Sequence, residues 1–193
     1  MLVFYFAPGS SSMAPHIALH EIGVPFEGRP ISLGKKETRT PEYLALNPEG
    51  HVPLLLVDGR PLTQVAAILF YLARRFPEAR LMPEGDLERE AQVVSWLSFL
   101  ASGVHPARRQ GLDAVRAAHG VAQAKLGHGE WALGSYSIVD IFLFRLFWRV
   151  SNSLPLTRAE FPGLFAHQDR MLARPAVKRT LELESALGYE FTA

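Results

Sequence analysis

The sequence predicts an α/β amino-terminal part followed by an all-α carboxy-terminal part. In the first part, apolar runs and helical periodicities alternate in the order β-α-β-α-β-β-α. Pro77 and Pro83 then interrupt the pattern, as is typical of a linker. Beyond them the apolar residues repeat at helical spacing, and no stretch is convincing as a strand. We therefore expect two domains, residues 1–77 and 86–193, joined by a linker at residues 78–85.

Local signals define the first elements. Leu2–Phe6 is a β-rich apolar run that predicts a buried strand, and a turn-rich loop with three consecutive serines follows it. A helix is predicted over Met13–Ile22, because Pro15 is tolerated in a first turn and Gly23 is a typical helix end. Two further elements complete this stretch: a strand at 26–33, which Pro30 places at a sheet edge, and a short helical turn at 41–46.

A strand–turn–strand–helix unit organises the chain. Pro53 precedes the apolar run Leu54–Val57, and the start of a strand is a position that tolerates proline. Asp58-Gly59 is a two-residue hairpin signal, and Arg60–Leu62 is the predicted return strand. The unit therefore predicts an antiparallel hairpin that leads directly into a helix.

Both ends of this hairpin expose backbone groups. The helix begins at Thr63 or Gln64, and the N–H groups around Gln64-Val65 have no partner within the helix, which suits a carboxylate. Before the hairpin, the N–H and C=O of Val52 are available to pair with an extended ligand. A peptide-like ligand would use both features, although the same residues also fit an ordinary α/β hairpin unit. Most X-Pro bonds are trans, so the pattern alone does not favour a cis bond at Pro53.

The remaining chain predicts a series of helices. The longest apolar one is opened by Ser137-x-x-Asp140, a capping box with Asp in place of Glu. On this helix Arg145 and Arg149 lie one turn apart, and we expect them to be solvated or paired rather than catalytic. The predicted helices are 86–104, ending in a break at His105-Pro106, then 112–126, 134–150, 161–173 and 175–186.

Composition excludes several classes of function. Apolar residues make up 48% of the chain and charged residues 20%, with a formal net charge of +1, so nothing indicates nucleic-acid or membrane binding. Cysteine is absent, which excludes disulfides, thiolate metal sites and Cys nucleophiles. The seven His residues show no metal-binding spacing. The apolar start lacks a basic region and a cleavage site, and residues 138–150 are too short and too charged to span a bilayer. We expect a soluble, cytoplasmic protein.

Five motifs, in this order, resemble the cytosolic glutathione transferase family. The start PGxxSxxPHIAL and the helix that ends in His-Pro are most similar to its bacterial beta class. The resemblance covers the whole chain. The motifs are APGSSSMAPHIALHEIG, NPEGHVPLLLVDGRPLTQVAAILFYLA, WLSFLASGVHPA, WALGSYSIVDIFLF and RPAVKRTLELESAL.

The resemblance implies a thioredoxin-like domain that binds glutathione, a helical domain that shapes a hydrophobic co-substrate site, and a homodimer. It implies a cis Val52-Pro53 bond, with the backbone of Val52 pairing with the cysteinyl part of glutathione. It also implies the other contacts of the ligand: Gln64 and Val65 for the γ-glutamyl carboxylate, Lys35 for the glycyl carboxylate, and Ser98 with the segment Ser102–His105 lining the site, partly across the dimer.

One departure from the family concerns the thiol. The beta class carries a cysteine where this chain has Ser11, so thiol-exchange chemistry is excluded. A serine hydroxyl at the start of the first helix can instead favour the thiolate of glutathione by donating a hydrogen bond to sulfur. Ser11 is the first candidate and Ser12 the second, and both also fit a role in capping the helix. At the start of the third helix, the family usually has an acidic residue followed by a serine. This chain has Gln64-Val65 there, and Val65 can offer a ligand only its backbone N–H.

A second departure is length. Residues 107–131 are several helical turns shorter than in the family, which implies a more open pocket. We expect a glutathione transferase that conjugates the thiolate to electrophilic hydrophobic compounds. The alternative is a non-catalytic module of the same fold that binds glutathione, a hydrophobic ligand or another protein.

Overall fold

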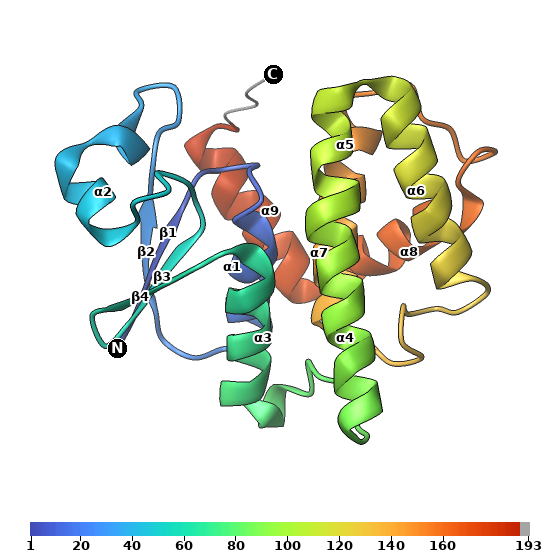
Figure 1. Cartoon of the computed structure of the whole chain (residues 1–193), viewed down its shortest axis with the longest axis horizontal. Coiled ribbons are helices and arrows are strands. Elements are labelled where there is room, and N and C mark those ends of the chain that lie inside the picture. Colours follow the sequence, from blue (N-terminus) through green and yellow to red (C-terminus); the bar gives the residue numbers. More distant parts are fainter. Residues whose placement is uncertain (190–193) are drawn as a thin grey trace. The chain divides into compact units, whose positions relative to one another are not determined.

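The computed structural model describes residues 1–189 and contains two compact units. The first comprises residues 1–72 together with the chain from Pro175 onwards, and the second comprises Ala73–Arg174. The chain's last helix therefore belongs to the unit that contains the sheet (Figure 1). The domain boundaries expected from the sequence, 1–77 and 86–193, stay a prediction.

A four-stranded mixed sheet forms the centre of the first unit, in the order β2-β1-β3-β4. The strand β1 (Leu2–Phe6) runs parallel to β2 (Glu27–Pro30) and antiparallel to β3 (Leu54–Val57), which pairs antiparallel with β4 (Arg60–Thr63). The edge position of β2 confirms the prediction from its proline. The strand is shorter than the expected 26–33: it ends at Pro30, opposite Phe6, the last residue of β1, and Ile31 N–H still donates to Phe6 O at 2.7 Å.

The predicted hairpin is confirmed between β3 and β4. Asp58 and Gly59 both have positive φ angles, 50° and 80°, as a type I′ turn requires. Gln64 also has a positive φ of 70°, and α3 (Val65–Arg75) begins at the next residue. The turn and this abrupt entry into α3 fix where the first residues of the helix lie relative to β3.

Three other helices complete the first unit: α1 (Met13–Ile22), α2 (Pro41–Leu46) and α9 (Pro175–Leu187). Helix α1 packs against β1 and against α9 (Figure 1). A 3₁₀ turn at Glu37–Arg39 precedes α2. The largest fully buried side chains of this unit come from the strands and from α1 and α3: Phe4, Met13, Ile17, Leu19, Leu54, Leu55, Ile68, Leu69 and Leu72.

The second unit is helical throughout its regular structure. Its central element is α7 (Ile138–Ser151), in which every residue from Ile138 to Val150 is buried. Helix α7 packs against α4 (Leu87–Phe99), α8 (Pro162–Ala173) and a π-helical segment, Leu100–Val104. The remaining elements are α5 (His105–Gln110), α6 (Leu112–Leu126) and a 3₁₀ turn at Pro77–Ala79.

The capping box that opens α7 is confirmed. Ser137 Oγ accepts from Val139 N–H at 3.2 Å, and Asp140 Oδ2 accepts from Ser137 N–H at 2.9 Å. Ala132 N–H also donates to Asp140, at 2.8 Å, so this carboxylate joins the helix start to the preceding loop. Burying the carboxylate is tolerated because its oxygens are hydrogen-bonded.

The break predicted at His105-Pro106 is wrong. His105 has helical angles (φ −58°, ψ −48°), and its N–H bonds to Leu100 O across the wider π turn. Pro106 lies in the first turn of α5, where a missing N–H is tolerated. The chain turns instead at Gly111, whose φ of 106° and ψ of 178° end α5.

Among residues 1–189, the helices are all too short or too polar to cross a membrane.

Candidate functional site

The loop before β3 is held by side chains that converge on one carbonyl. Tyr43 Oη donates to the carbonyl oxygen of His51 at 2.6 Å, and Asn47 Nδ2 donates to the same oxygen at 2.7 Å. Burial raises the pKa of Tyr43 to about 12, although its hydrogen bond with Asn47 acts in the opposite direction, so the phenol stays protonated as a donor. This loop therefore reaches Val52 in a fixed conformation.

The Val52-Pro53 peptide bond is cis, as the resemblance implied. The Val52 side chain packs against the core cluster that contains Tyr5, Tyr43 and Leu54. Within residues 1–189, no hydrogen bond engages the backbone N–H or C=O of Val52. Its side chain is thus anchored while its backbone polar groups are available to an extended ligand.

The start of α3 carries an interaction that sequence reasoning missed. Gln64 Nε2 donates to Glu49 Oε2 at 2.7 Å, which places a carboxylate beside the helix start. The first intrahelical bond of α3 runs from Ile68 N–H to Gln64 O. The N–H groups of residues 65–67 therefore have no acceptor within the helix. A ligand that carries both a carboxylate and an ammonium group would find a partner for each here. No local motif joins Glu49 to Gln64, because fifteen residues separate them.

Lys35 is exposed in the loop between β2 and the 3₁₀ turn at Glu37–Arg39. Ser32 orders the loop through two hydrogen bonds. Its Oγ accepts from Lys35 N–H at 3.1 Å, and the N–H of Ser32 donates to Glu37 Oε2 at 2.7 Å. In the described part of the chain, the Lys35 ammonium group forms no ion pair. An exposed cation on an ordered loop suits an anionic group of a ligand.

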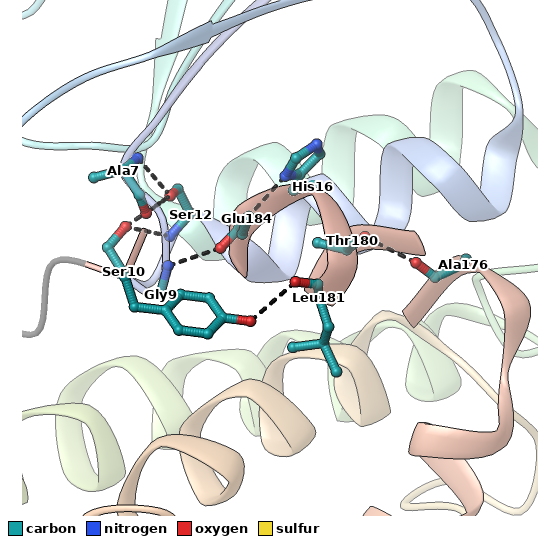
Figure 2. A network of polar contacts seen from close by, with 10 residues as sticks. Ala7, Gly9, Ser10, Ser12, His16, Ala176, Thr180, Leu181 and Glu184 are labelled. Carbon is teal, nitrogen blue, oxygen red and sulfur yellow. Dashed lines mark hydrogen bonds and ion pairs between the residues drawn. The ribbon is translucent and has the colours of Figure 1, made fainter. Parts of the chain in front are cut away.

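The three serines before α1 have different roles. Ser12 is fully buried, and its Oγ both accepts from Ala7 N–H and donates to Ala7 O, each at 3.1 Å. Ser10 Oγ lies 2.7 Å from the same hydroxyl (Figure 2). Ser11 is partly exposed, and its hydroxyl has no hydrogen-bond partner among residues 1–189. Neither candidate caps α1 by its side chain, and only Ser11 presents an unengaged hydroxyl.

Helix α9 supports this serine loop from the far end of the sequence. Gly9 N–H donates to Glu184 Oε2 at 2.7 Å, and Nδ1 of His16 lies 2.8 Å from Glu184 Oε1 (Figure 2). His16 and Glu184 are both buried. One carboxylate thus joins the loop, α1 and α9, and no spacing rule reveals a contact over 175 residues.

Ser98 and His105 lie in the second unit, so their relation to the residues above stays a prediction. Ser98 is exposed, and its carbonyl accepts from Ser102 Oγ at 2.7 Å. The His105 ring reaches the surface, yet desolvation lowers its pKa to about 4, with the positive charges of Arg145, Arg109 and Arg108 adding to the effect. His105 is therefore a neutral donor or acceptor at neutral pH.

Residues 1–189 contain no group of three or more His, Cys, Asp or Glu side chains arranged to hold a metal ion. The first unit contains several groups that are each suited to part of a peptide-like ligand with several charges. These groups are the backbone of Val52, the start of α3, Lys35 and the hydroxyl of Ser11.

Comparison with known proteins identifies the fold and then the family. A mixed sheet with flanking helices, followed by a helical unit, is the glutathione transferase fold, and the predicted fold class is confirmed. Residues 1–74 match the model of the glutathione S-transferase N-terminal domain. Glutathione S-transferase GST-4.5 of Xanthomonas campestris is 32% identical over 202 residues, which cover 93% of this chain and 97% of the relative. The chain therefore belongs to the glutathione S-transferase family, and it is a transferase.

Two solved structures are similar over nearly the whole chain. A sphingomonad glutathione S-transferase complexed with glutathione has a TM-score of 0.84 at 32% identity, covering 95% of this chain and 98% of that one. A bacterial beta class glutathione S-transferase of Sphingomonas chungbukensis has a TM-score of 0.82 at 34% identity, covering 94% and 98%. The resemblance inferred from the five motifs is confirmed.

Proposed function

We propose that this transferase binds glutathione and conjugates its thiolate to an electrophilic compound with an apolar body. The observation that carries the proposal is the unengaged hydroxyl of Ser11 at the start of α1, in the same unit as the available backbone of Val52. The sphingomonad relative in complex with glutathione supports the choice of thiol.

The tripeptide would be held by groups of the first unit at three places. The Val52 backbone, with Pro53 fixing the direction of β3, would pair with the cysteinyl part. The start of α3 at Gln64 and Val65 would take the γ-glutamyl carboxylate, while Glu49 would attract the ammonium group beside it. Lys35 would meet the glycyl carboxylate. Within a homodimer, Ser98 and His105 would add polar contacts from the helical domain.

Ser11 would supply the chemical step by donating its hydroxyl proton as a hydrogen bond to the glutathione sulfur. A free thiol has a pKa of about 8.5, and only the thiolate is a strong nucleophile. A hydrogen bond to a charged group contributes about 1.5–3 kcal/mol, and the start of α1 adds a favourable dipole. Ser12 is a weaker candidate, because its hydroxyl is buried and engaged by Ala7.

The experiment measures the thiolate absorbance of bound glutathione against pH, together with conjugation of 1-chloro-2,4-dinitrobenzene. Ser11→Ala should raise the apparent thiol pKa towards that of free glutathione and lower turnover about ten- to a hundredfold, while glutathione affinity changes little. Ser10→Ala is the control on the same loop. An unchanged titration in Ser11→Ala would refute the hydroxyl mechanism. Retained glutathione binding without any conjugate would favour the alternative, a non-catalytic binding module.

A further inference from the structure

The second unit contains a cavity of about 440 Å³ that the proposed function does not use. Its lining comes from the segment 80–84, from Arg89 on α4 and from the loop 133–135 that precedes α7. This volume lies within the usual range of small-molecule sites, about 300–1,000 Å³. None of the residues assigned above to glutathione or its thiol lines the cavity.

Hydrogen bonding and close packing hold the segments around the cavity in place. Leu81 is 1% exposed, and its carbonyl accepts from Ile138 N–H at 2.9 Å, which joins the segment 80–84 to the start of α7. Gly85 has a φ of 150°, and a Cβ at this position would lie 2.8 Å from the Cβ of Arg89. Only glycine therefore allows the chain to approach α4 this closely. The cavity is bounded by segments whose conformation is fixed.

Charged side chains of both signs line the cavity without pairing with each other. Arg80 and Glu84 lie in one segment, yet neither side chain forms a hydrogen bond or an ion pair within residues 1–189. Arg89 donates through Nη1 to Gln92 at 2.9 Å, and its other guanidinium nitrogens have no partner in the same part of the chain. The cavity therefore offers donors to an anionic group and an acceptor to a cationic group.

Apolar side chains complete the lining. Met82, Pro83 and Leu133 border the cavity, and Leu133 is itself buried. An apolar group that covers these side chains would be removed from water, which is favourable. The lining thus combines an apolar surface with separate positive and negative charges.

The surrounding charges indicate the class of ligand. Between residues 78 and 90 the chain carries five carboxylates and two guanidinium groups, so this part of the surface does not favour a ligand with a net negative charge. A ligand with a net positive charge would meet the guanidinium groups of Arg80 and Arg89 within the cavity. A zwitterion avoids both conflicts, because each of its charges finds an opposite charge that has no ion-pair partner.

We propose that this cavity binds an α-amino acid with an apolar side chain. The carboxylate would bind Arg80 and Arg89, since guanidinium groups bind carboxylates in a bidentate way. The ammonium group would bind Glu84, and the side chain would cover the apolar part of the lining. The inference does not depend on the proposed function, because its residues are distinct from those assigned to glutathione.

Three probes of similar shape test the proposal. L-phenylalanine carries both charges, 3-phenylpropanoate lacks the ammonium group, and 2-phenylethylamine lacks the carboxylate. Isothermal titration calorimetry measures the affinity of each probe for the full chain. Phenylalanine should bind about three- to tenfold more tightly than either of the others, because ion pairs at exposed side chains are partly screened. Equal affinities of the three probes would overturn the proposal.

Charge-removing variants assign each contact. Arg80→Gln should weaken phenylalanine binding about three- to tenfold and leave 2-phenylethylamine unaffected, whereas Arg80→Lys should retain part of the affinity. Glu84→Gln should weaken phenylalanine binding and leave 3-phenylpropanoate unaffected. Glu88→Gln and Arg109→Gln are the matched controls, because both are exposed residues of the same unit outside the lining. Far-UV circular dichroism establishes that each variant folds. Equal losses in the controls would overturn the proposal.

The start of α3 is a second place that suits a zwitterion, so the titrations are repeated with saturating glutathione and with Gln64→Ala. Phenylalanine binding that persists in both and still depends on Arg80 supports the cavity. Displacement by glutathione together with insensitivity to Arg80→Gln overturns the inference and leaves the proposed function intact. If glutathione does not bind while phenylalanine binding depends on Arg80, the proposed function fails and the amino-acid site stands.

Discussion

Nδ1 of His16 on α1 lies 2.8 Å from Oε1 of Glu184 on α9, and both side chains are buried. The second oxygen of Glu184 accepts from Gly9 N–H, at the start of the loop that carries Ser11. This carboxylate therefore couples the last helix of the chain to the proposed thiol-activating loop (Figure 2). Its removal would leave a buried imidazole and a buried backbone N–H without their acceptor.

Glu184→Ala should lower the free energy of unfolding by about 3–5 kcal/mol, as is typical when one partner of a buried charged contact is removed. Urea unfolding followed by far-UV circular dichroism measures the change. Glu182→Ala, on the exposed side of the same helix, is the control and should change stability by less than about 0.5 kcal/mol. Equal stabilities of the two variants would show that the buried contact contributes nothing.

Ser12→Ala should destabilise the protein by about 1–3 kcal/mol, because the N–H and C=O of Ala7 would lose a partner inside the buried loop. Ser11→Ala removes the same hydroxyl from a partly exposed side chain without such bonds, and it should leave the unfolding midpoint nearly unchanged. Thermal and urea unfolding of the two variants are compared directly. A larger loss of stability in Ser11→Ala would contradict the assignment of Ser12 as the structural serine.

Lys35→Ala should weaken glutathione binding about two- to fivefold, as expected for one exposed ion pair. Isothermal titration calorimetry with glutathione measures the affinity, and Lys36→Ala is the neighbouring control. The difference between the two variants should shrink as NaCl is added, because exposed charges are screened. An effect of Lys36→Ala as large as that of Lys35→Ala would indicate a general electrostatic attraction rather than a specific contact.

Stability should depend on pH through His20. Burial, followed by the charges of His16 and Arg179, lowers its pKa from 6.5 to about 4, and its Nε2 has no hydrogen-bond partner within residues 1–189. Because the folded state disfavours the charged ring, stability is complete above pH 6.5 and falls as the pH decreases towards 4. Because the ring is only partly buried and solvent screens its charge, the loss should be smaller than this shift alone implies, about 1–3 kcal/mol.

His20→Phe should flatten this part of the profile, whereas His128→Gln, at an exposed position, should leave it unchanged. Urea unfolding at intervals between pH 7 and pH 4 measures both profiles. A profile of His20→Phe that declines as steeply as that of the wild type would place the acid sensitivity in other groups.

The proposed homodimer predicts a particle of twice the chain mass in light scattering at micromolar concentration. The family resemblance motivates this expectation, together with the segment Ser102–His105, which by that resemblance we expect to line the site partly across the dimer. A monomer at that concentration would contradict it, and with it any contribution of His105 to the partner's site.

The sequence by itself determined the elements whose signals are local. Met13–Ile22 and Leu112–Leu126 were predicted with the bounds that the structure gives, because Gly23 ends the first helix and the second is rich in alanine, a strong helix former. The hairpin at Asp58-Gly59 and the capping box at Ser137 followed from motifs of two to four residues. The order of such motifs also indicated the family.

Only the tertiary structure decided how distant residues cooperate. It engaged the hydroxyl of Ser12 and left that of Ser11 available, a difference that two adjacent serines cannot reveal in the sequence. It also joined Glu184 to Gly9 and buried Arg145 and Arg149 near the charges of α5. Local propensities act over a few residues, whereas these contacts depend on where whole helices pack. A site built from such contacts is therefore defined only after the chain has folded.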